Sequence, residues 1–206
     1  MVRRALVPGI TGQDGAYLAR FLLGKGYNVY GTYRRLSTPN FYRLQYLGIF
    51  EKIDLIPIDL ADMSSIIEAI QIADPDEIYN LAAQSFVEAS FDQPVATADV
   101  SGLAVTRFLE AVRQIKPDAR FYQASSSEMF GTMEGSAQAL TERDAFGPLS
   151  PYAASKLYGH WITKIYRDAY SIFACSGILF DHESPLRGLE FVTRKISNAV
   201  VKILET

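Results

Sequence analysis

A tyrosine and a lysine four positions apart, Tyr152 and Lys156, are the residues of this sequence best suited to acid–base chemistry. Residues four apart share one face of a helix, so the spacing predicts that the lysine ammonium lies beside the tyrosine phenol. A nearby cation favours the phenolate and lowers the pKa of tyrosine from its usual value of about 10. We therefore expect a base that can remove a proton from a sugar or alcohol hydroxyl near neutral pH.

A glycine-rich segment at residues 9–15, Gly-Ile-Thr-Gly-Gln-Asp-Gly, lies upstream of this pair. It follows a short apolar run and precedes apolar residues at helix spacing, which is the strand–turn–helix order of a dinucleotide site. A helix that begins near Gln13 would direct its amide N–H groups at a pyrophosphate. An ordinary tight turn is the alternative. Together the two motifs predict hydride transfer between a hydroxyl-bearing carbon and a dinucleotide.

The ends of the next two predicted strands indicate which dinucleotide would bind. Arg34 and Arg35 stand where an NAD site would carry an acidic residue for the ribose 2′-hydroxyl. Guanidinium groups bind phosphate well, so the pair favours NADP; the alternative is a basic pair in solvent. Further on, Asp59 and Leu60 could hold the adenine, although a helix N-cap would explain Asp59 as well.

Short apolar runs alternate along the chain with longer segments of helical periodicity. This alternation predicts an α/β fold with a doubly wound parallel sheet and right-handed crossovers. In such sheets ligands bind beyond the carboxyl ends of the strands. The predicted strands are residues 5–7, 28–33, 53–58, 77–81, 120–124 and 173–180; the predicted helices begin near residue 13 or span residues 66–70, 97–115 and 152–170, and residues 125–149 are expected to form an active-site loop.

The composition is that of a globular protein, with 49% hydrophobic and 21% charged residues among 206. A formal net charge of −3 gives no basic field that would favour nucleic acid or an anionic membrane. No apolar stretch is long enough to span a bilayer. The single cysteine, Cys175, suits a reducing compartment, so we expect a cytoplasmic protein with a buried, inert thiol. His160 and His182 have no other ligands at metal spacing, so no metal site is expected.

Five segments of the sequence closely resemble the GDP-mannose 4,6-dehydratases, which are extended short-chain dehydrogenase/reductases. They are residues 9–15, 80–85, 121–128, 182–188 and 190–195. The resemblance implies an NADP-binding Rossmann-like domain at residues 1–180, followed at residues 181–206 by the start of a sugar-nucleotide-binding region. Chains of the family continue well past this point, so the resemblance implies that the substrate-binding part is largely absent here.

The resemblance also implies roles for individual residues. The catalytic residues would be Ser126, Glu128, Tyr152 and Lys156. The residues near the sugar nucleotide would be Ser85, Ser126, Glu128, Asp181, Arg187 and Arg194. The residues in contact with NADP would be Gly9, Thr11, Gly12, Gln13, Asp14, Gly15, Arg34, Arg35, Asp59, Leu60, Leu81, Ala82, Ala83, Gln84, Ser85, Tyr152, Lys156, His182 and Arg187.

The reaction that the resemblance implies converts GDP-mannose to GDP-4-keto-6-deoxymannose. Tyr152 would remove the O4 proton while Ser126 hydrogen-bonds the same oxygen, and hydride would pass from C4 to NADP. Glu128 would take the C5 proton and then, as an acid, help to expel the O6 hydroxyl as water before hydride returns to C6. Dehydratases of the family associate as homodimers or homotetramers, so a homo-oligomer is expected.

Two other functions stay open at this point. A related nucleotide-sugar reductase or epimerase would not need the carboxylate of Glu128, which could instead be a capping or loop residue. An NADP-binding module without turnover is favoured by the short chain and by two substitutions of family residues. Pro8 stands in place of threonine and is expected to distort the glycine turn, and Asp181 in place of asparagine would repel a diphosphate. Ser126 replaces threonine but keeps the hydroxyl.

Overall fold

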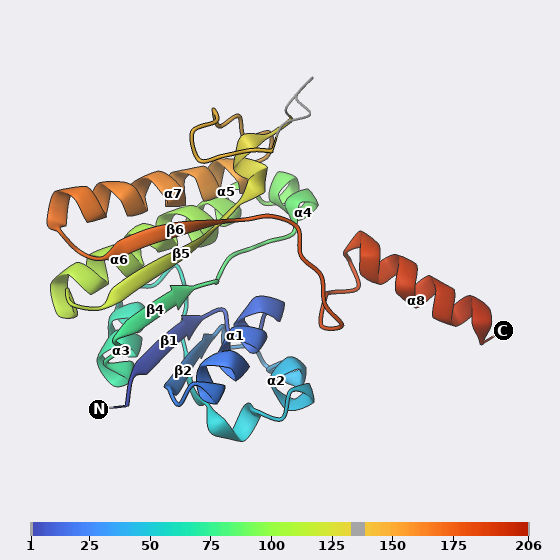
Figure 1. Ribbon diagram of the computed structural model, residues 1–206, viewed down its shortest axis with the longest axis horizontal. Coiled ribbons are helices and arrows are strands. Elements are labelled where there is room, and N and C mark those ends of the chain that lie inside the picture. Colours follow the sequence, from blue (N-terminus) through green and yellow to red (C-terminus); the bar gives the residue numbers. More distant parts are fainter. Residues whose placement is uncertain (1, 133–138, 206) are drawn as a thin grey trace.

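The computed structural model of the chain describes residues 2–132 and 139–205. Its centre is a six-stranded parallel sheet in the order β3-β2-β1-β4-β5-β6, flanked by helices (Figure 1). The predicted α/β fold and its strands are confirmed, whereas residues 133–138 of the predicted active-site loop lie outside the described residues. The strands are β1 (Arg4–Pro8), β2 (Asn28–Tyr33), β3 (Asp54–Pro57), β4 (Glu77–Asn80), β5 (Arg120–Ser126) and β6 (Ala174–Leu179).

The strand order explains where a ligand can enter. From β1 the chain proceeds outward to β2 and β3, and then returns to the other side of β1 to form β4. The connections beyond β1 and β4 therefore leave the sheet in opposite directions and open a crevice between them. The glycine-rich segment at residues 9–15 lies directly after β1, at this crevice.

Two layers of helices cover the sheet, and the alternation of side chains along β1 shows how each layer is held. Ala5 and Val7 belong to the cluster on one face, whereas Leu6 belongs to the cluster on the other. One layer consists of α1 (Gln13–Gly24) and α2 (Tyr42–Tyr46), and the other of α3 (Met63–Ala73), α6 (Ala104–Ile115) and α7 (Pro151–Tyr170) (Figure 1).

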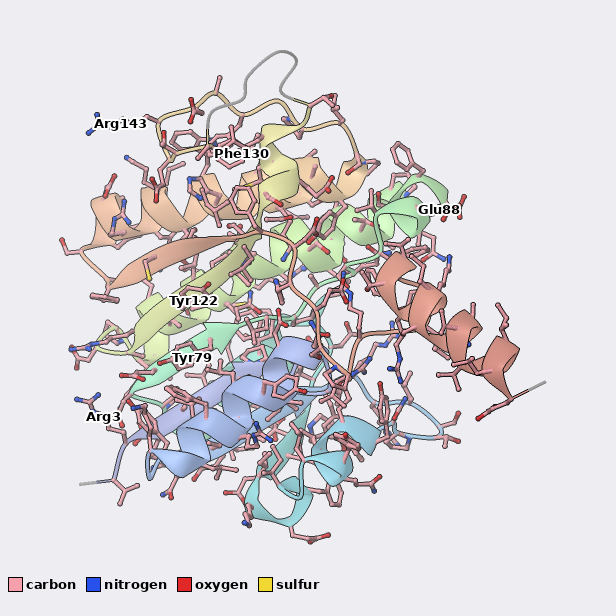
Figure 2. The ribbon with its side chains drawn as sticks, turned by 45° about the vertical axis from the view of Figure 1, so that its right-hand side comes forward. Arg3, Tyr79, Glu88, Tyr122, Phe130 and Arg143 are labelled. Atoms are coloured by element: carbon pink, nitrogen blue, oxygen red, sulfur yellow. The ribbon has the colours of Figure 1, made fainter. Side chains whose placement is uncertain are left out.

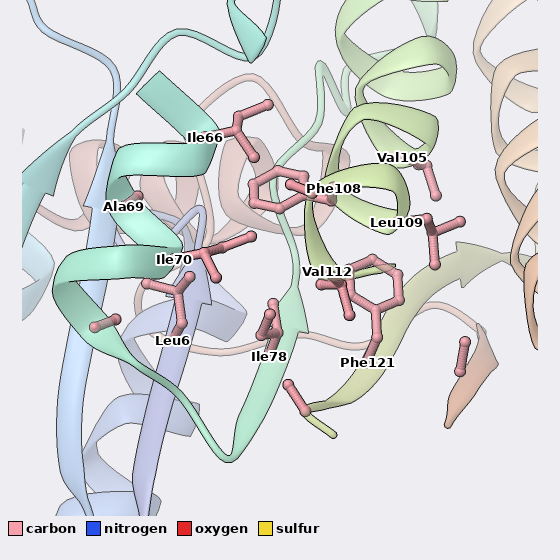
Figure 3. Packing of buried hydrophobic residues seen from close by; sticks show 14 of the residues in the cluster. Leu6, Ile66, Ala69, Ile70, Ile78, Val105, Phe108, Leu109, Val112 and Phe121 are labelled. Atoms are coloured by element: carbon pink, nitrogen blue, oxygen red, sulfur yellow. The ribbon is translucent and has the colours of Figure 1, made fainter. Parts of the chain in front are cut away.

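The larger core cluster lies between the sheet and the layer of α3, α6 and α7. Phe108 of α6 and Phe121 of β5 are both 0% exposed, and their ring centroids are 6.5 Å apart. Figure 3 shows them packed with Ile70 and Ile78, which come from α3 and β4. Because these residues join two helices to two strands, this cluster holds the layer in place.

The predicted helix at residues 97–115 begins earlier than expected and contains a wide turn. The carbonyl of Asp99 accepts hydrogen bonds from the N–H of Ala104, five residues on, and from the guanidinium of Arg107 at 3.3 Å. Arg107 also pairs with the Asp99 carboxylate at 2.6 Å, so one side chain stabilises this π-helical turn. The helix is made of α5 (Pro94–Ala98), the π turn η2 (Asp99–Leu103) and α6.

Several short elements were not predicted from the sequence, because they are too short to show a hydrophobic period. Two of them lie in the connection from β2 to β3. The other two follow β4 and β5, at the edge of the sheet where the glycine turn lies. They are α2, η1 (Phe50–Lys52), α4 (Val87–Asp92) and η3 (Ser127–Phe130).

The chain ends in a helix that stands apart from the sheet. Residues 180–191 lead from β6 into α8 (Val192–Leu204), which extends away from the sheet and its helix layers (Figure 1). None of its residues is buried, and Ile196 and Val200 are 59% and 50% exposed. In the part of the chain that the structure describes, no helix is long and apolar enough to cross a membrane.

Candidate active site

The glycine turn is shaped by a close approach of two backbone segments. Gly9 has φ +82°, and a Cβ at this position would lie 2.8 Å from the backbone N of Ala82. A Cβ on Gly15 would collide with the carbonyl of Gly9, so α1 can start this close to the turn only with glycine. The turn closes with a hydrogen bond of 3.0 Å from the Gly12 N–H to the Gly9 carbonyl. The N-terminus of α1 is thereby open to an anion.

Pro8 is accommodated without the distortion expected from the sequence. It is the last residue of β1, and its carbonyl accepts a 3.0 Å hydrogen bond from the N–H of Leu81. The next residue but one, Ile10, donates its N–H to the carbonyl of Thr32 at 3.3 Å. The strand therefore keeps its neighbours on both sides, and the missing N–H of proline leaves the turn intact.

Tyr152 and Lys156 lie on one face of α7, as their spacing predicts. Ser150 caps this helix by accepting a 3.0 Å hydrogen bond from the N–H of Ala153. The Nζ of Lys156 is 5.7 Å from the centroid of the Tyr152 ring and donates to the carbonyl of Ala124 at 2.9 Å. The two side chains are close, but the ammonium bonds to β5 rather than to the phenol.

The expected fall in the pKa of Tyr152 is wrong for this arrangement. Burial raises the pKa of Tyr152, and a hydrogen bond with Ser126 acts in the opposite direction without cancelling it. Burial also lowers the pKa of Lys156 to about 8, because desolvation disfavours its charged form. Lys156 is only 5% exposed, so for this pair desolvation outweighs the charge attraction that the spacing suggested.

Ser126 and Glu128 lie where β5 ends and η3 begins. The Oγ of Ser126 accepts a 3.2 Å hydrogen bond from the N–H of Glu128 and so caps the short helix. The capping residue is thus Ser126 and not Glu128, whose carboxylate is exposed at the cavity wall. Its negative charge contributes to the raised pKa of Tyr152, which places the two groups within electrostatic reach of each other.

The segment after β6 is tied to the start of α1 by side chains. Nε2 of His182 lies 2.8 Å from both carboxylate oxygens of Asp14, and its Nδ1 lies 2.7 Å from the carbonyl of Phe180. The backbone carbonyl and then Asp14 raise the pKa of His182. Beside this pair, the hydroxyl of Ser184 donates to the side-chain oxygen of Gln13 at 2.7 Å. Two residues predicted to contact a cofactor thus contact each other.

Residues from each of these segments line one cavity of 720 Å³ beyond the carboxyl ends of β1, β4 and β5. It lies at the crevice that the strand order opens, and both motifs found in the sequence contribute to its wall. The predicted residues that it brings together are Gly9, Gly12, Gln13, Asp14, Gly15, Leu81, Ala83, Ser85, Ser126, Glu128, Tyr152, Lys156, Asp181, His182 and Arg187.

Other predicted site residues lie outside this wall. Arg34 and Arg35 are exposed in the connection after β2, and Asp59 and Leu60 follow β3. The N-cap role considered for Asp59 is wrong, because Asp62 caps α3 by accepting from two backbone N–H groups. The remaining predicted residues outside the wall are Thr11, Ala82, Gln84 and Arg194, of which Arg194 lines an adjacent cavity of 300 Å³ together with Arg187.

The sequence profile of the GDP-mannose 4,6-dehydratase family matches residues 6–206. The chain belongs to this family. The GDP-mannose 4,6-dehydratase of Yersinia enterocolitica is 48% identical over 209 residues, which cover 98% of this chain and 56% of that protein. GDP-mannose 4,6 dehydratase 2 of Arabidopsis thaliana is 50% identical, covering 97% of this chain and 55% of that protein. This member of the GDP-mannose 4,6-dehydratase family therefore spans about half the length of the curated relatives it matches.

A solved structure confirms the fold expected for a GDP-mannose 4,6-dehydratase family member. The dTDP-glucose 4,6-dehydratase of Streptomyces venezuelae, crystallised with NAD, superposes with a TM-score of 0.83 at 20% identity. The matched region covers 97% of this chain and 62% of that chain. At this identity the likeness establishes the Rossmann-like sheet and its flanking helices.

Sequence reasoning missed several residues of this GDP-mannose 4,6-dehydratase family site. Arg43 of α2 lines the cavity, and Ser125 is 3% exposed at its wall with no hydrogen-bond partner for its hydroxyl among the described residues. The adjacent hydroxyls made Ser125 detectable in principle, because it lies directly before Ser126. Arg43 carried no such signal, since its contacts are to residues far away in the sequence.

Cys175 belongs to the sheet rather than to the site. Cys175 lies on β6 and pairs in register with Tyr122 of β5. The ring centroid of Tyr122 lies 6.2 Å from that of Tyr79 on β4 (Figure 2). The thiol is half-buried, not buried as expected. Burial still raises its pKa, so little of it is the reactive thiolate at neutral pH. Among the described residues, no group of three or more His, Cys, Asp or Glu side chains could hold a metal ion.

Proposed function

We propose that this chain carries the NADP site and the catalytic side chains of a GDP-mannose 4,6-dehydratase. The observation that carries the proposal is that Ser126, Glu128, Tyr152 and Lys156 line the same cavity as the glycine turn. A simple reductase or epimerase has no use for a carboxylate beside the serine and tyrosine. Residues 1–180 would form the cofactor domain, and residues 181–206 the start of the sugar-nucleotide region.

The residues of the turn fit a dinucleotide. Gly9 and Gly15 let the turn approach the backbone of Ala82 and the start of α1 more closely than a Cβ would allow, which sets the first N–H groups of α1 at the cavity wall. Arg34 and Arg35 support NADP over NAD, because guanidinium groups suit a 2′-phosphate and no carboxylate follows β2 to take a 2′-hydroxyl. NADP bound here would supply the acceptor for the hydride of C4 and the donor for C6.

The side chains would divide the proton transfers among themselves. Tyr152 would take the proton of O4, and Ser126 would hold the same oxygen by a hydrogen bond. Because burial raises the pKa of Tyr152, the phenolate needs a positive neighbour, and Arg187 acts in this direction. Glu128 would remove the proton of C5 and return one to the departing O6 hydroxyl, a double role that an exposed carboxyl can perform.

We also propose a homodimer or homotetramer in the cytoplasm. An apolar stripe on α7 supports an assembly, since Tyr158, Trp161 and Ile165 are 41%, 46% and 53% exposed. A free, half-buried cysteine supports a reducing compartment.

The test is to incubate the chain with GDP-mannose and catalytic NADP, and to follow the nucleotide sugars by mass. Loss of one water, abolished by Glu128→Gln and kept by the control Glu68→Gln, would support the dehydratase. Glu68 is an exposed carboxylate on α3 and lies outside the cavity wall. Intact GDP-mannose together with NADP binding would leave a cofactor-binding module without turnover, and a reduced or epimerised sugar would point to the other enzyme class.

A further inference from the structure

Arg43 joins two segments of the cavity wall that are far apart in the sequence. Its Nη1 donates to the carbonyl of Thr11 at 3.0 Å, and its Nε donates to the carbonyl of Leu186 at 2.9 Å. Thr11 belongs to the glycine turn, and Leu186 belongs to the segment that also carries His182 and Arg187. One guanidinium therefore fixes the distance between the turn and this segment.

The position of Arg43 is set by its neighbours in α2. Leu44 is 0% exposed and packs in the same cluster as Leu186, which is 2% exposed. The ring of Tyr42 lies 4.7 Å from the guanidinium carbon. Leu44 anchors α2 in the core and the ring of Tyr42 lies beside the guanidinium, so Arg43 is preorganised at the cavity wall.

The charge of Arg43 is not neutralised by the residues described. Both of its hydrogen bonds go to neutral carbonyls, and within residues 2–132 and 139–205 no carboxylate lies at ion-pair distance from it. By contrast, His182 is paired with Asp14 and Arg187 with Glu183. A guanidinium has five N–H donors, of which these contacts use two. An unpaired guanidinium beside the N-terminus of α1 is suited to a phosphate group.

We propose that Arg43 binds a phosphate group of the dinucleotide while it holds the glycine turn against the segment of residues 181–188. The inference rests on the proposed dinucleotide function and adds a residue to it. Arg43 would be a phosphate-binding and positioning residue. It links the cofactor to the segment that carries Asp181, His182 and Arg187, so cofactor binding would order both sides of the cavity.

The experiment compares the dissociation constants of NADP and NAD for the unchanged chain, Arg43→Gln and Arg43→Lys. Arg20→Gln is the matched control, because Arg20 is an exposed arginine of α1 outside the cavity wall. We expect Arg43→Gln to weaken binding about tenfold or more, with a shallower salt dependence, and Arg43→Lys to lose less because it keeps the charge. Equal losses for both dinucleotides would indicate the diphosphate, and a loss confined to NADP the 2′-phosphate; both support the inference.

Unchanged dissociation constants in a folded Arg43→Gln variant would overturn the inference while the proposed cofactor stands. If that variant does not fold, Arg43→Lys decides. An ammonium lacks the planar set of five N–H donors with which a guanidinium can bind two carbonyls and a phosphate together. We then expect a threefold or greater loss, and an unchanged affinity with an unchanged salt dependence would overturn the inference. If the unchanged chain binds neither dinucleotide, the proposed function fails and this inference fails with it.

Discussion

The imidazole of His182 contacts the carboxylate of Asp14, with Nε2 2.8 Å from both oxygens. The two residues are 168 positions apart in the sequence. The pair joins the segment after β6 to the first turn of α1, and both residues line the cavity. It therefore couples the placement of that segment to the protonation of one histidine.

We predict that this pair makes the unfolding midpoint depend on pH. The pKa of His182 is raised, first by the Phe180 carbonyl and then by Asp14, so the folded chain binds more protons than the unfolded chain above about pH 6.5. The stabilisation is complete below that pH and is lost as the pH rises through the raised pKa. His182→Gln should remove it, at a cost below about 1 kcal/mol at pH 6 because the pair is partly exposed.

Thermal unfolding between pH 5.5 and 8.5 checks this prediction, with His160→Gln as a control of opposite sign. Burial lowers the pKa of His160, so its contribution is lost as the pH falls below about 6.5. Identical pH profiles for the unchanged chain and His182→Gln would show that the contact does not form in solution.

Lys156 should make the chain more stable as the pH rises from 7.5 to 9.5. Its folded-state pKa is about 8, below that of an unfolded lysine, so the unfolded chain binds more protons in this window. The expected gain is about 2 kcal/mol, by linkage between this value and a reference pKa of about 10.4. Urea unfolding of the chain and of Lys156→Met at several pH values measures it. An equally steep rise in Lys156→Met would assign the effect to other groups.

Gly15→Ala should destabilise the chain by about 1–3 kcal/mol, because the added methyl group would collide with the carbonyl of Gly9 and the backbone of Ile10. We expect it to weaken dinucleotide binding as well, since α1 would shift away from the turn. Gly24→Ala is the matched control on the same helix. Nothing lies within 4 Å of a Cβ at Gly24, so this change should be neutral or stabilise by about 0.4–1 kcal/mol. Denaturant unfolding and NADP titration would show both effects, and equal behaviour of the two variants would contradict the crowding.

Phe108→Ala should cost about 3–5 kcal/mol, because its ring is fully buried between α3, α6 and the sheet. The control is Phe21→Ala on α1, where the ring is 58% exposed and contacts the ammonium of Lys25 at 4.9 Å. That change should cost less than about 1 kcal/mol. The difference between the two unfolding free energies tests whether the cluster of Figure 3 is the main core.

The sheet was predictable because each strand carries its own signal. Short runs rich in β-branched and aromatic residues, such as residues 28–33 between the Gly26 turn and Arg34, match strands such as β2. The glycine turn and the pair of Tyr152 and Lys156 were likewise local patterns. Their meeting in one cavity followed from the rule that strands of a parallel sheet present their carboxyl ends together.

What the sequence did not reveal depends on distance or burial. The raised pKa of Tyr152 comes from desolvation, which spacing along a helix cannot show. The contacts of Arg43 join segments 32 and 143 positions away, and α2 has only five residues, too few for a period. The role of Asp62 as the cap of α3 was missed because Asp59, an equally good capping residue, lies three positions earlier.

The π turn at Asp99–Leu103 limits which changes of length this part of the chain tolerates. The turn bonds residue i to i+5 and so holds one residue more than an α-helical turn, and deleting one residue within it would leave an ordinary α-helical turn with both parts of the helix facing as they do now. A deletion in the helix just outside the turn would instead rotate one part by about 100° relative to the other. Val105, Phe108, Leu109 and Val112 would then leave the sheet, or α5 would turn away from α7. A variant shortened by one residue outside the turn would thus exchange a buried face for a polar one, whereas a deletion within the turn would keep both faces. Alignment gaps of one residue within this helix should therefore be confined to the turn, whereas the connections around the helix should tolerate gaps of any length.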